Sequence, residues 1–438
     1  MNTQDRQIIH IALPSILSNI TVPLLGLVDV AIVGHLGAAK YIGAIAVGSM
    51  LFNIIYWIFG FLRMGTSGMT SQALGQRDLS EAMRLLARSL GIGMLTAIIL
   101  LFLQTPICQF ALSVIRPSED VAQLATLYFH ICIWGAPAML GLYGLTGWFI
   151  GMQNSRIPMF IAITQNIVNI LISLCLVFVG GMKVEGVALG TLVAQYAGLA
   201  MGGILWIRHY GKLRKYLHIR TDQLLWAKTA MSRFFQVNRD IFLRTLCLVS
   251  VTLFFTTAGA SQGETILAVN TLLMQLFTLF SYVMDGFAYA GEALSGRYIG
   301  ARNLPAFQSI IKRLFIWGAA VTGIFTLIYT LGGNTFLAIL TNDRQVIQAT
   351  DAYFYWAIAI PVTGVAAFIW DGVFIGATAT REMLLSMATA AACFFTVYYG
   401  FHSQWGNHAL WLAFLCYLGV RGVVQTCLLP RIIRRYFP

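Results

Sequence analysis

Charged side chains are scarce in this chain of 438 residues. Asp, Glu, Lys and Arg make up 10% of it, whereas hydrophobic residues make up 58% and the mean hydropathy is +0.77. Because soluble domains carry about 25% charged residues, this scarcity excludes an ordinary soluble domain. The apolar residues form long blocks, and about 20 apolar residues are what a helix needs to cross a bilayer. The shorter alternation of β-barrel strands, about 10 residues each, is absent, so we expect an all-α integral membrane protein.

Motifs that would indicate other chemistry are missing as well. The seven cysteines stand singly in apolar segments, without CxxC pairs or metal-ligand spacing, so we expect free thiols and no cofactor. The sequence has no HExxH and no Walker A motif, which argues against a metalloprotease and against bound ATP as the energy source. The first residues lack the basic start and cleavage site of a signal peptide, so the first helix is expected to direct its own insertion.

Twelve apolar blocks predict twelve transmembrane helices. They begin near residues 8, 42, 84, 121, 157, 186, 239, 265, 307, 346, 382 and 408. Odd-numbered connections carry only four cations, namely Lys40, Arg116, Lys183 and Arg344, and most other Lys and Arg lie in the even-numbered connections and at both ends. By the positive-inside rule, both termini and the long basic loop 208–233 are expected in the cytoplasm, where the loop has room for an interfacial helix. The net charge of +12 therefore reflects topology, and we expect no nucleic-acid partner.

An internal repeat divides the chain into two halves. Three pairs of stretches share one shift of 225 residues: GWFIG (147–151) with GVFIG (372–376), GQRDL (75–79) with GARNL (300–304), and VAQLATLYF (121–129) with VIQATDAYF (346–354). We predict an N-lobe over 1–208, a basic cytoplasmic linker over 209–234 and a C-lobe over 235–438. Six spans per half make the repeats parallel, which is typical of transporters that bind cargo between two lobes and alternate access.

Four acidic residues fall inside predicted spans, namely Asp29, Asp285, Glu292 and Asp371. A charged residue at the bilayer centre costs about 2.5–3.5 kcal/mol on insertion scales, so such residues serve a function or are paired. The structural alternative for Asp29 is a helix–helix hydrogen bond. For Asp285 and Asp371 it is an ion pair with one of three arginines in inner turns, Arg63, Arg244 or Arg421. Glu292 falls at the inner end of its span, where we expect partial hydration.

Several polar residues share the depth of Asp29. At 1.5 Å of rise per residue, four side chains lie roughly 7–11 Å below the outer surface: Asp29, Tyr128, Ser173 and Thr191. Asn169 is one turn deeper on the same helix face as Ser173. A carboxylate, an amide, hydroxyls and a phenol at one depth suit a site for Na⁺, which prefers hard oxygen ligands, or for a proton on the carboxylate.

The chain resembles the multidrug and toxic compound extrusion (MATE) family, specifically its DNA-damage-inducible protein F (DinF) branch. The resemblance is carried by ALPSILSNITVPLLGLVDVAIVGHLG, GFLRMGTSGMTSQALG, NRDIFLR, MDGFAYAGEALSG, WDGVFIGATATREM and GNHALWLA, which together cover both halves. It implies a twelve-helix, V-shaped antiporter that exports amphipathic, often cationic compounds against inward H⁺ or Na⁺ flow. It also implies a multi-pass protein of the inner membrane, which we expect to act as a monomer.

The resemblance assigns roles to individual residues. It implies that Asp29 binds the coupling ion and that Asn169, Thr191 and Tyr128 accompany it. Ser173 departs from the pattern, because some relatives carry a second aspartate there, and this departure favours H⁺ over Na⁺. The acids at 285, 292 and 371 match positions that serve as a candidate second-lobe coupling or substrate site. We further expect the first span to bend at Pro14 or Pro23, since each proline removes a helical hydrogen bond.

Two other functions are compatible with parts of the sequence. A flippase for lipid-linked oligosaccharides would use a cationic cavity, for which the three inner arginines are candidates. An intramembrane hydrolase would use the serine of GTSG (65–68), but His130 and His402, the nominal bases, lie in no supporting motif. An exporter of small molecules remains the prediction.

Overall fold

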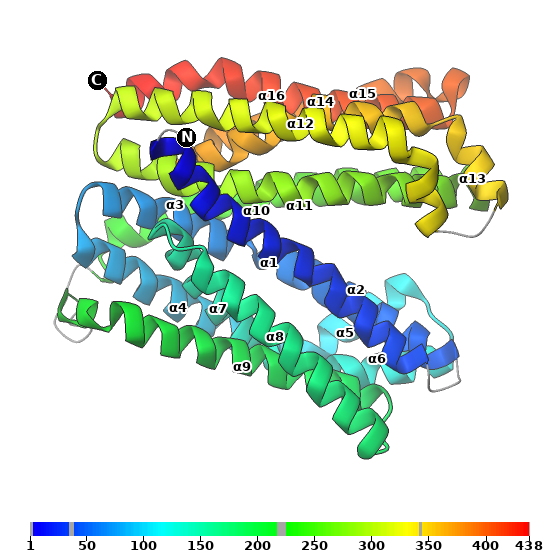
Figure 1. The fold of residues 1–438 in the computed structure, drawn as a ribbon. Helices are drawn as coiled ribbons and strands as arrows, with labels where there is room; N and C mark the ends of the chain where they lie inside the picture. The colour runs from blue at the N-terminus through cyan, green and yellow to red at the C-terminus, as the bar shows by residue number, and fades with distance from the viewer. Residues whose placement is uncertain (1–2, 35–38, 217–224, 341–343, 438) are drawn as a thin grey trace. The chain divides into compact units, whose positions relative to one another are not determined.

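The computed structural model describes residues 3–34, 39–216, 225–340 and 344–437, and helices form nearly all of this (Figure 1). No β-strand occurs among these residues. The α-helices are α1 (Thr3–Gly34), α2 (Ala39–Phe59), α3 (Phe61–Gly75), α4 (Leu79–Phe102), α5 (Gln104–Ile115), α6 (Glu119–Cys132), α7 (Ala136–Gly151), α8 (Arg156–Leu174), α9 (Val184–Tyr210), α10 (Lys228–Ala260), α11 (Glu264–Gly300), α12 (Leu304–Leu340), α13 (Arg344–Asp351), α14 (Phe354–Gly376), α15 (Thr380–Trp405) and α16 (Asn407–Tyr436). Two 3₁₀ segments, η1 (Ile133–Gly135) and η3 (Gly211–Tyr216), and one π-helical segment, η2 (Cys175–Val179), complete the described elements.

The all-helical membrane fold predicted from the sequence is confirmed. Eleven segments among the described residues are long and apolar enough to cross a membrane. Helix α1 contains the first predicted span, and its 32 residues, at about 1.5 Å each, exceed the thickness of a hydrocarbon core, about 30 Å. Two of the spans are interrupted, one by a turn at Gly60 between α2 and α3 and one by η1 between α6 and α7.

The basic loop between the sixth and seventh spans is shorter than predicted. Helix α9 continues to Tyr210, η3 follows directly, and α10 already begins at Lys228. Arg214 of η3 stacks over the Trp206 ring, 5.7 Å from its centroid, and such cation–π contact stabilises a basic segment against an aromatic side chain. Residues 217–224, where the interfacial helix would lie in part, are outside the described residues.

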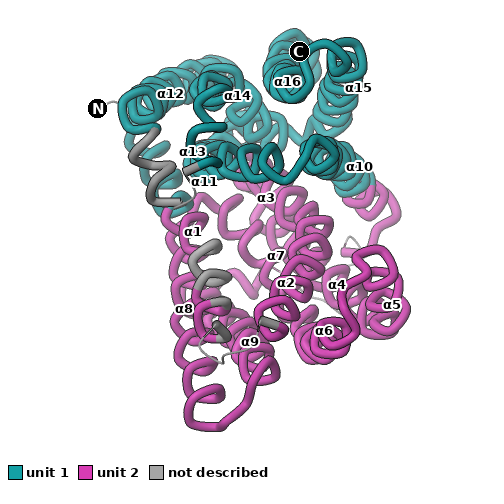
Figure 2. Tube along the Cα trace, turned by 90° about the vertical axis from the view of Figure 1, so that its right-hand side faces the viewer, with its two compact units in different colours: residues 1–16, 236–438 teal, residues 17–235 magenta. Residues whose placement is uncertain are grey.

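The chain forms two compact units, which Figure 2 distinguishes by colour. Unit 2 comprises residues 17–235, and unit 1 comprises residues 1–16 together with 236–438. The sequence predicted that residues 1–208 form one half. The structure instead groups the first sixteen residues with residues 236–438. Hydrogen bonds explain this grouping, because Asp5 accepts from Trp317 Nε1 at 3.2 Å and from Arg313 Nη1 at 3.4 Å, both on α12. Helix α1 therefore begins in one unit and ends in the other.

The 225-residue repeat recurs in the packing of each unit. A Cβ built on Gly147 of α7 would lie 2.3 Å from the Arg63 carbonyl oxygen of α3. A Cβ on Gly372 of α14 would lie 2.1 Å from the corresponding carbonyl oxygen, that of Ala288 in α11. Only glycine permits such a close approach of two helix backbones. Each unit thus uses the glycine of its G-x-F-I-G motif to bring two helices together.

The turns that follow these helices repeat as well. Residues with positive φ angles occur at Arg77 (60°) and Arg302 (50°), and again at Gln153 (63°) and Thr378 (50°). Both pairs are separated by 225 residues. In each case the left-handed residue follows a helix C-terminus, where it allows the last carbonyls to be hydrogen-bonded. The GQRDL and GARNL stretches are therefore equivalent helix caps.

Aromatic side chains fill the interior of both units. In unit 2 the indole of Trp148 is fully buried, donates to the Ala82 carbonyl oxygen at 2.8 Å and meets the Tyr210 ring edge-on. In unit 1 Trp411 is equally buried and donates to Asn270 Oδ1 at 2.8 Å. Because each buried N–H has an acceptor, these large side chains add apolar area without an unpaired polar group.

Candidate functional site

Asp29 lies in the second part of α1, within unit 2. Its side chain is only 5% exposed, and its Oδ1 atom has no hydrogen-bond partner in the described part of the chain. The carboxylate is near enough to Tyr128 and Cys132 of α6 to interact with both electrostatically. Burial of an ionised carboxylate is unfavourable unless it is paired or hydrogen-bonded, so Asp29 is a candidate for binding a proton or a cation.

Tyr128 is placed by close packing between α6 and α2. The side chain is 3% exposed, and a Cβ on Gly48 of α2 would lie 2.3 Å from its ring. Its hydroxyl lies near the side chains of Ser49 and Cys132. Sequence reasoning named Tyr128 but missed Cys132, although a spacing of four residues puts the two on the same helix face. The thiol therefore belongs to the polar surroundings of Asp29.

Asn169 and Thr191 join α8 to α9 by a direct hydrogen bond. Asn169 donates from Nδ2 to Thr191 Oγ1 at 3.0 Å, and Asn169 and Ser173 are fully buried. The two helices approach closely because Gly190 has no side chain: a Cβ there would lie 2.1 Å from Ser173 Oγ. The sequence predicted that these residues share one depth, and the structure brings Asn169 into contact with Thr191.

Three oxygen atoms of the predicted site residues have no hydrogen-bond partner among the described residues. They are Oδ1 of Asp29, Oδ1 of Asn169 and Oγ of Ser173. Carboxylate, amide and hydroxyl oxygens are the ligands that hard cations prefer. No cluster of three or more His, Cys, Asp or Glu residues suited to a metal occurs in the described parts of the chain.

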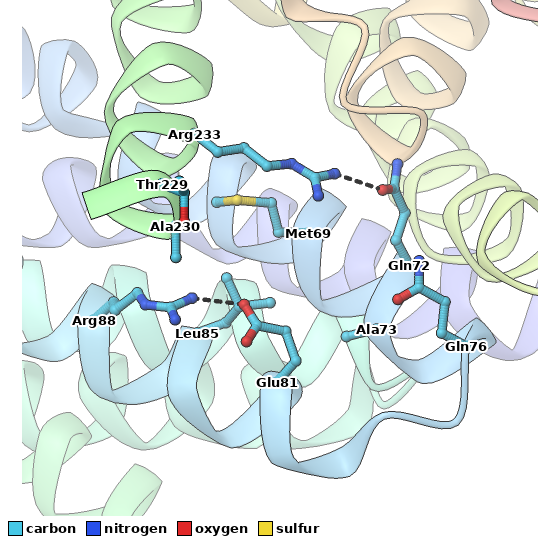
Figure 3. Close-up of a pocket in the computed structure, with 10 residues that line it drawn as sticks. All are labelled: Met69, Gln72, Ala73, Gln76, Glu81, Leu85, Arg88, Thr229, Ala230 and Arg233. Carbon is cyan, nitrogen blue, oxygen red and sulfur yellow. Dashed lines mark hydrogen bonds and ion pairs between the residues drawn. The ribbon is translucent and has the colours of Figure 1, made fainter. Parts of the chain in front are cut away.

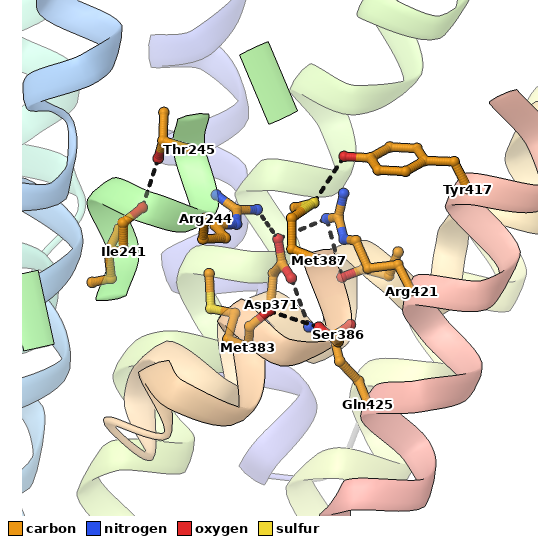
Figure 4. A network of polar contacts seen from close by, with 11 residues as sticks. Ile241, Arg244, Thr245, Asp371, Met383, Ser386, Met387, Tyr417, Arg421 and Gln425 are labelled. Carbon is orange, nitrogen blue, oxygen red and sulfur yellow. Dashed lines mark hydrogen bonds and ion pairs between the residues drawn. The ribbon is translucent and has the colours of Figure 1, made fainter. Parts of the chain in front are cut away.

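Asp371 of α14 lies at the centre of an ionic network in unit 1 (Figure 4). Arg244 of α10 donates to its Oδ2 atom, Arg421 of α16 donates to the same atom at 2.6 Å, and Gln425 Nε2 donates to Oδ1 at 2.8 Å. All four side chains are buried. Asp371 thus has the arginine partners that the sequence offered as the structural alternative for this acid. Gln425 was missed, although it follows Arg421 by one helical turn.

The other two acids of unit 1 lie on α11. Asp285 is half-buried and interacts electrostatically with Arg421 and Tyr282. Glu292 is 1% exposed, so the expected partial hydration of this residue is wrong. It is enclosed because α14 packs directly against α11: a Cβ on Gly376 would lie 2.4 Å from the Glu292 carbonyl oxygen.

Helix α1 contains both predicted bending points. It is helical without interruption from Thr3 to Gly34, through Pro14 and Pro23. The boundary between the two units follows Ile16, two residues after Pro14. The Pro23 side chain lies outside the described residues.

Comparisons with known proteins concern the family and the fold of the chain. A family model described as MatE matches residues 14–175 and 241–399, in both halves of the chain. The chain is similar to DNA damage-inducible protein F of Escherichia coli (strain K12), with 39% identity over 97% of this chain and 91% of that protein. It is also similar to Probable multidrug resistance protein NorM of Photorhabdus laumondii subsp. laumondii, with 22% identity over 78% of this chain and 75% of that one.

Solved structures share the fold. A crystal structure described as MATE in the bent conformation has a TM-score of 0.89 at 16% identity, covering 100% of this chain and 98% of that chain. The bent form of the Vibrio cholerae MATE transporter VcmN has a TM-score of 0.87, also at 16% identity, covering 100% of this chain and 99% of that one. At such low identity the likeness concerns the fold alone.

Proposed function

Because the chain belongs to the MatE family and is therefore a multi-pass membrane transporter and not an enzyme, we propose that it is a secondary antiporter. It exports amphipathic, cationic compounds in exchange for protons. Asp29 is the coupling site, and access alternates between the two sides of the membrane. The observation that carries this proposal is a buried carboxylate, 5% exposed, whose Oδ1 has no hydrogen-bond partner in the described part of the chain.

The surroundings of Asp29 support a proton as the coupling ion. Among the predicted site residues Asp29 is the sole carboxylate of its unit, and the position that carries a second aspartate in some relatives holds Ser173. The Thr191 hydroxyl already accepts the Asn169 amide at 3.0 Å. A proton needs a single basic atom, whereas Na⁺ needs several oxygen ligands at once. Sodium coupling is the second candidate, supported by the oxygens of Asn169 and Ser173 that have no partner among the described residues.

The charge of Asp29 provides a mechanism for exchange. The ionised carboxylate attracts a cationic compound, and protonation from the outer side removes that attraction. Protonation also lets α1 bend at Pro14 or Pro23, where proline has removed a helical hydrogen bond. Each inward proton is thereby coupled to the release of outward cargo, in keeping with reciprocal linkage between two ligands of one site.

The ionic network in unit 1 argues against the flippase alternative. A cationic cavity for lipid-linked oligosaccharides would need inner arginines free to face the cargo. Two of the three inner arginines, Arg244 and Arg421, are instead bonded to Asp371. The second-lobe acids then assist cargo binding or hold the helices, and the half-buried Asp285 is the better candidate for contact with cargo. We place both termini in the cytoplasm, the protein in the inner membrane, and one chain in each functional transporter.

Transport in proteoliposomes tests the proposal. We expect efflux of a fluorescent cationic dye to follow an imposed pH gradient and to be independent of an imposed Na⁺ gradient. Asp29→Asn should abolish this efflux. The matched control is Asp120→Asn, because Asp120 is an exposed aspartate of the same unit whose surface partner is Lys40 at 3.6 Å. Full transport by Asp29→Asn would refute the coupling role, and efflux driven by Na⁺ alone would replace the proton.

A further inference from the structure

Unit 2 contains a polar pocket that the proposed transport mechanism does not use. Its volume is about 270 Å³, and it lies where the end of α3, the start of α4 and the start of α10 meet (Figure 3). Its lining comprises Met69, Gln72, Ala73, Gln76, Glu81, Leu85, Arg88, Thr229, Ala230 and Arg233. None of these residues belongs to the predicted Asp29 site. A pocket of this size accommodates a small polar group and not a drug-sized ligand, which needs roughly 300–1,000 Å³.

Positive charge predominates around this pocket. Arg88 of α4 is 1% exposed; it donates from Nη1 to Glu81 Oε1 at 2.6 Å and from Nε to the Leu225 carbonyl oxygen at 2.7 Å. Arg233 of α10 donates to Gln72 Oε1 at 3.1 Å. Arg84 lies 3.3 Å from the other oxygen of Glu81. The lining therefore holds two guanidinium groups and one carboxylate, and the guanidinium group of Arg84 contacts that carboxylate from outside the lining. This excess of positive charge favours an anionic ligand.

The internal repeat shows which group is missing from the pocket. Shifted by 225 residues, Arg88 corresponds to Arg313 of unit 1, and Ala230 corresponds to Asp5. In unit 1 the Asp5 carboxylate accepts from Arg313 Nη1 at 3.4 Å and from Trp317 Nε1 at 3.2 Å, and it is 8% exposed. Unit 2 has the equivalent arginine, but the equivalent position on α10 carries only a methyl group.

Neighbouring contacts establish that the two regions are equivalent. In unit 1 the Gln4 side chain donates to the Ala306 carbonyl oxygen at 3.4 Å. Gln4 corresponds to Thr229, and Ala306 corresponds to Glu81. Both Thr229 and Glu81 line the pocket of unit 2. The start of α10 thus packs on α3 and α4 as the start of α1 packs on α11 and α12. Glu81 and Arg88 both lie on α4, where they form an ion pair. The space beside Ala230 remains part of the pocket.

We propose that this pocket binds a phosphate group, which occupies the place that the Asp5 carboxylate holds in unit 1. Arg88 and Arg233 approach the pocket from different helices, as Figure 3 shows, and guanidinium groups match the planar pairs of oxygens that phosphate presents. Thr229 adds a hydroxyl, and Met69 and Leu85 supply an apolar wall. The phosphate belongs either to a phospholipid headgroup or to free phosphate, since the chemistry of recognition is shared.

Titration of the purified full-length protein in detergent tests this site without any transport measurement. The probes are dihexanoyl phosphatidylglycerol, inorganic phosphate and, as a phosphate-free control, dihexanoylglycerol, with calorimetry as the readout. We expect saturable binding of at least one phosphate-bearing probe and none of dihexanoylglycerol. Binding of the lipid alone identifies a headgroup site, and binding of inorganic phosphate as well identifies a site for free phosphate.

Three variants connect binding to the pocket. Arg233→Gln should weaken binding about ten-fold or more, because it removes a hydrogen bond between a guanidinium group and a charged phosphate. Lys228→Gln removes an exposed charge from the first turn of α10 without touching the lining, and it should change affinity less than about two-fold. Ala230→Asp restores the unit 1 arrangement and should abolish binding while the protein melts at the same or a higher temperature.

Two results would overturn the site. One is the absence of saturable binding by both phosphate-bearing probes. The other is unchanged affinity in Ala230→Asp and Arg233→Gln, which would mean that the phosphate binds elsewhere. Because the readout is binding, a protein that fails to transport cations can still bind phosphate here, and the two proposals stand or fall separately.

Discussion

The Nη2 atom of Arg421 lies 2.6 Å from Oδ2 of Asp371, with both side chains buried in unit 1. Arg244 donates to the same oxygen from α10, so one carboxylate joins three helices. Removing one member of a buried ion pair leaves the other charge without compensation, and this costs far more than the intact pair contributes. We therefore expect Asp371 to contribute mainly to the stability of the folded protein.

Asp371→Asn should destabilise the protein by about 3–5 kcal/mol, because two guanidinium groups then remain buried without their carboxylate. Thermal unfolding in detergent measures the effect. Asp351→Asn is the control, since Asp351 is an exposed acid at the end of α13. An unchanged melting temperature in Asp371→Asn would show that the network contributes nothing to stability.

Gly190→Ala should perturb the packing of α8 on α9. The new methyl group would lie 2.1 Å from Ser173 Oγ and 3.0 Å from the Ser173 backbone nitrogen, and overpacking of this kind costs about 1–3 kcal/mol. Gly203→Ala on the same helix meets no atom within 4 Å and should be neutral or slightly stabilising. Melting temperatures compare the two. Equal stability would mean that the helices separate at little cost.

Gly372→Ala tests whether the second half depends on its glycine. The added Cβ would lie 2.1 Å from the Ala288 carbonyl oxygen, a backbone atom that cannot rotate away. We expect a loss of about 1–3 kcal/mol, seen as a lower melting temperature and a lower yield of folded protein. Gly419→Ala, with no atom within 4 Å, is the control in the same unit. A fully stable Gly372→Ala would contradict the close α11–α14 packing.

Ser173→Asp should change ion dependence. A second carboxylate one helical turn from Asn169 provides the hard oxygen ligands that Na⁺ requires. We expect efflux from proteoliposomes to become stimulated by an inward Na⁺ gradient, because the variant adds one oxygen ligand. Ser173→Asn, which adds similar volume without charge, separates the two effects. If neither variant responds to Na⁺, Ser173 does not contribute to ion selection.

Much of the fold followed from the sequence, for reasons visible in particular residues. Apolar blocks of membrane length predict helices, because inside a bilayer only a helix or a closed β-barrel provides hydrogen bonds for every backbone N–H and C=O group. The glycines at 147 and 372 indicated equivalent halves, and both prove to be points of close backbone contact. The end of α9 and the start of α10 were misjudged, because Lys and Arg in 208–233 obscured helical turns that continue beyond the apolar blocks.

The candidate site was only partly predictable. Helical spacing placed Asn169 and Ser173 on one face, and depth placed Thr191 beside them, which the hydrogen bond at 3.0 Å bears out for Asn169 and Thr191. Depth does not specify partners, however. Nothing in the sequence indicated that Asp371 would bind Arg244 and Arg421 together, or that Glu292 would be enclosed.

By itself the sequence determined the class of protein, because the cost of burying charge and unpaired backbone groups in lipid dictates long apolar helices and makes each internal acid conspicuous. The tertiary structure alone decided which acids have partners. Asp29 keeps an oxygen with no hydrogen bond among the described residues, while Asp371 is surrounded by arginines from other helices. The physical reason is that an ion pair depends on distances of a few ångströms between helices far apart in the chain, which only packing sets.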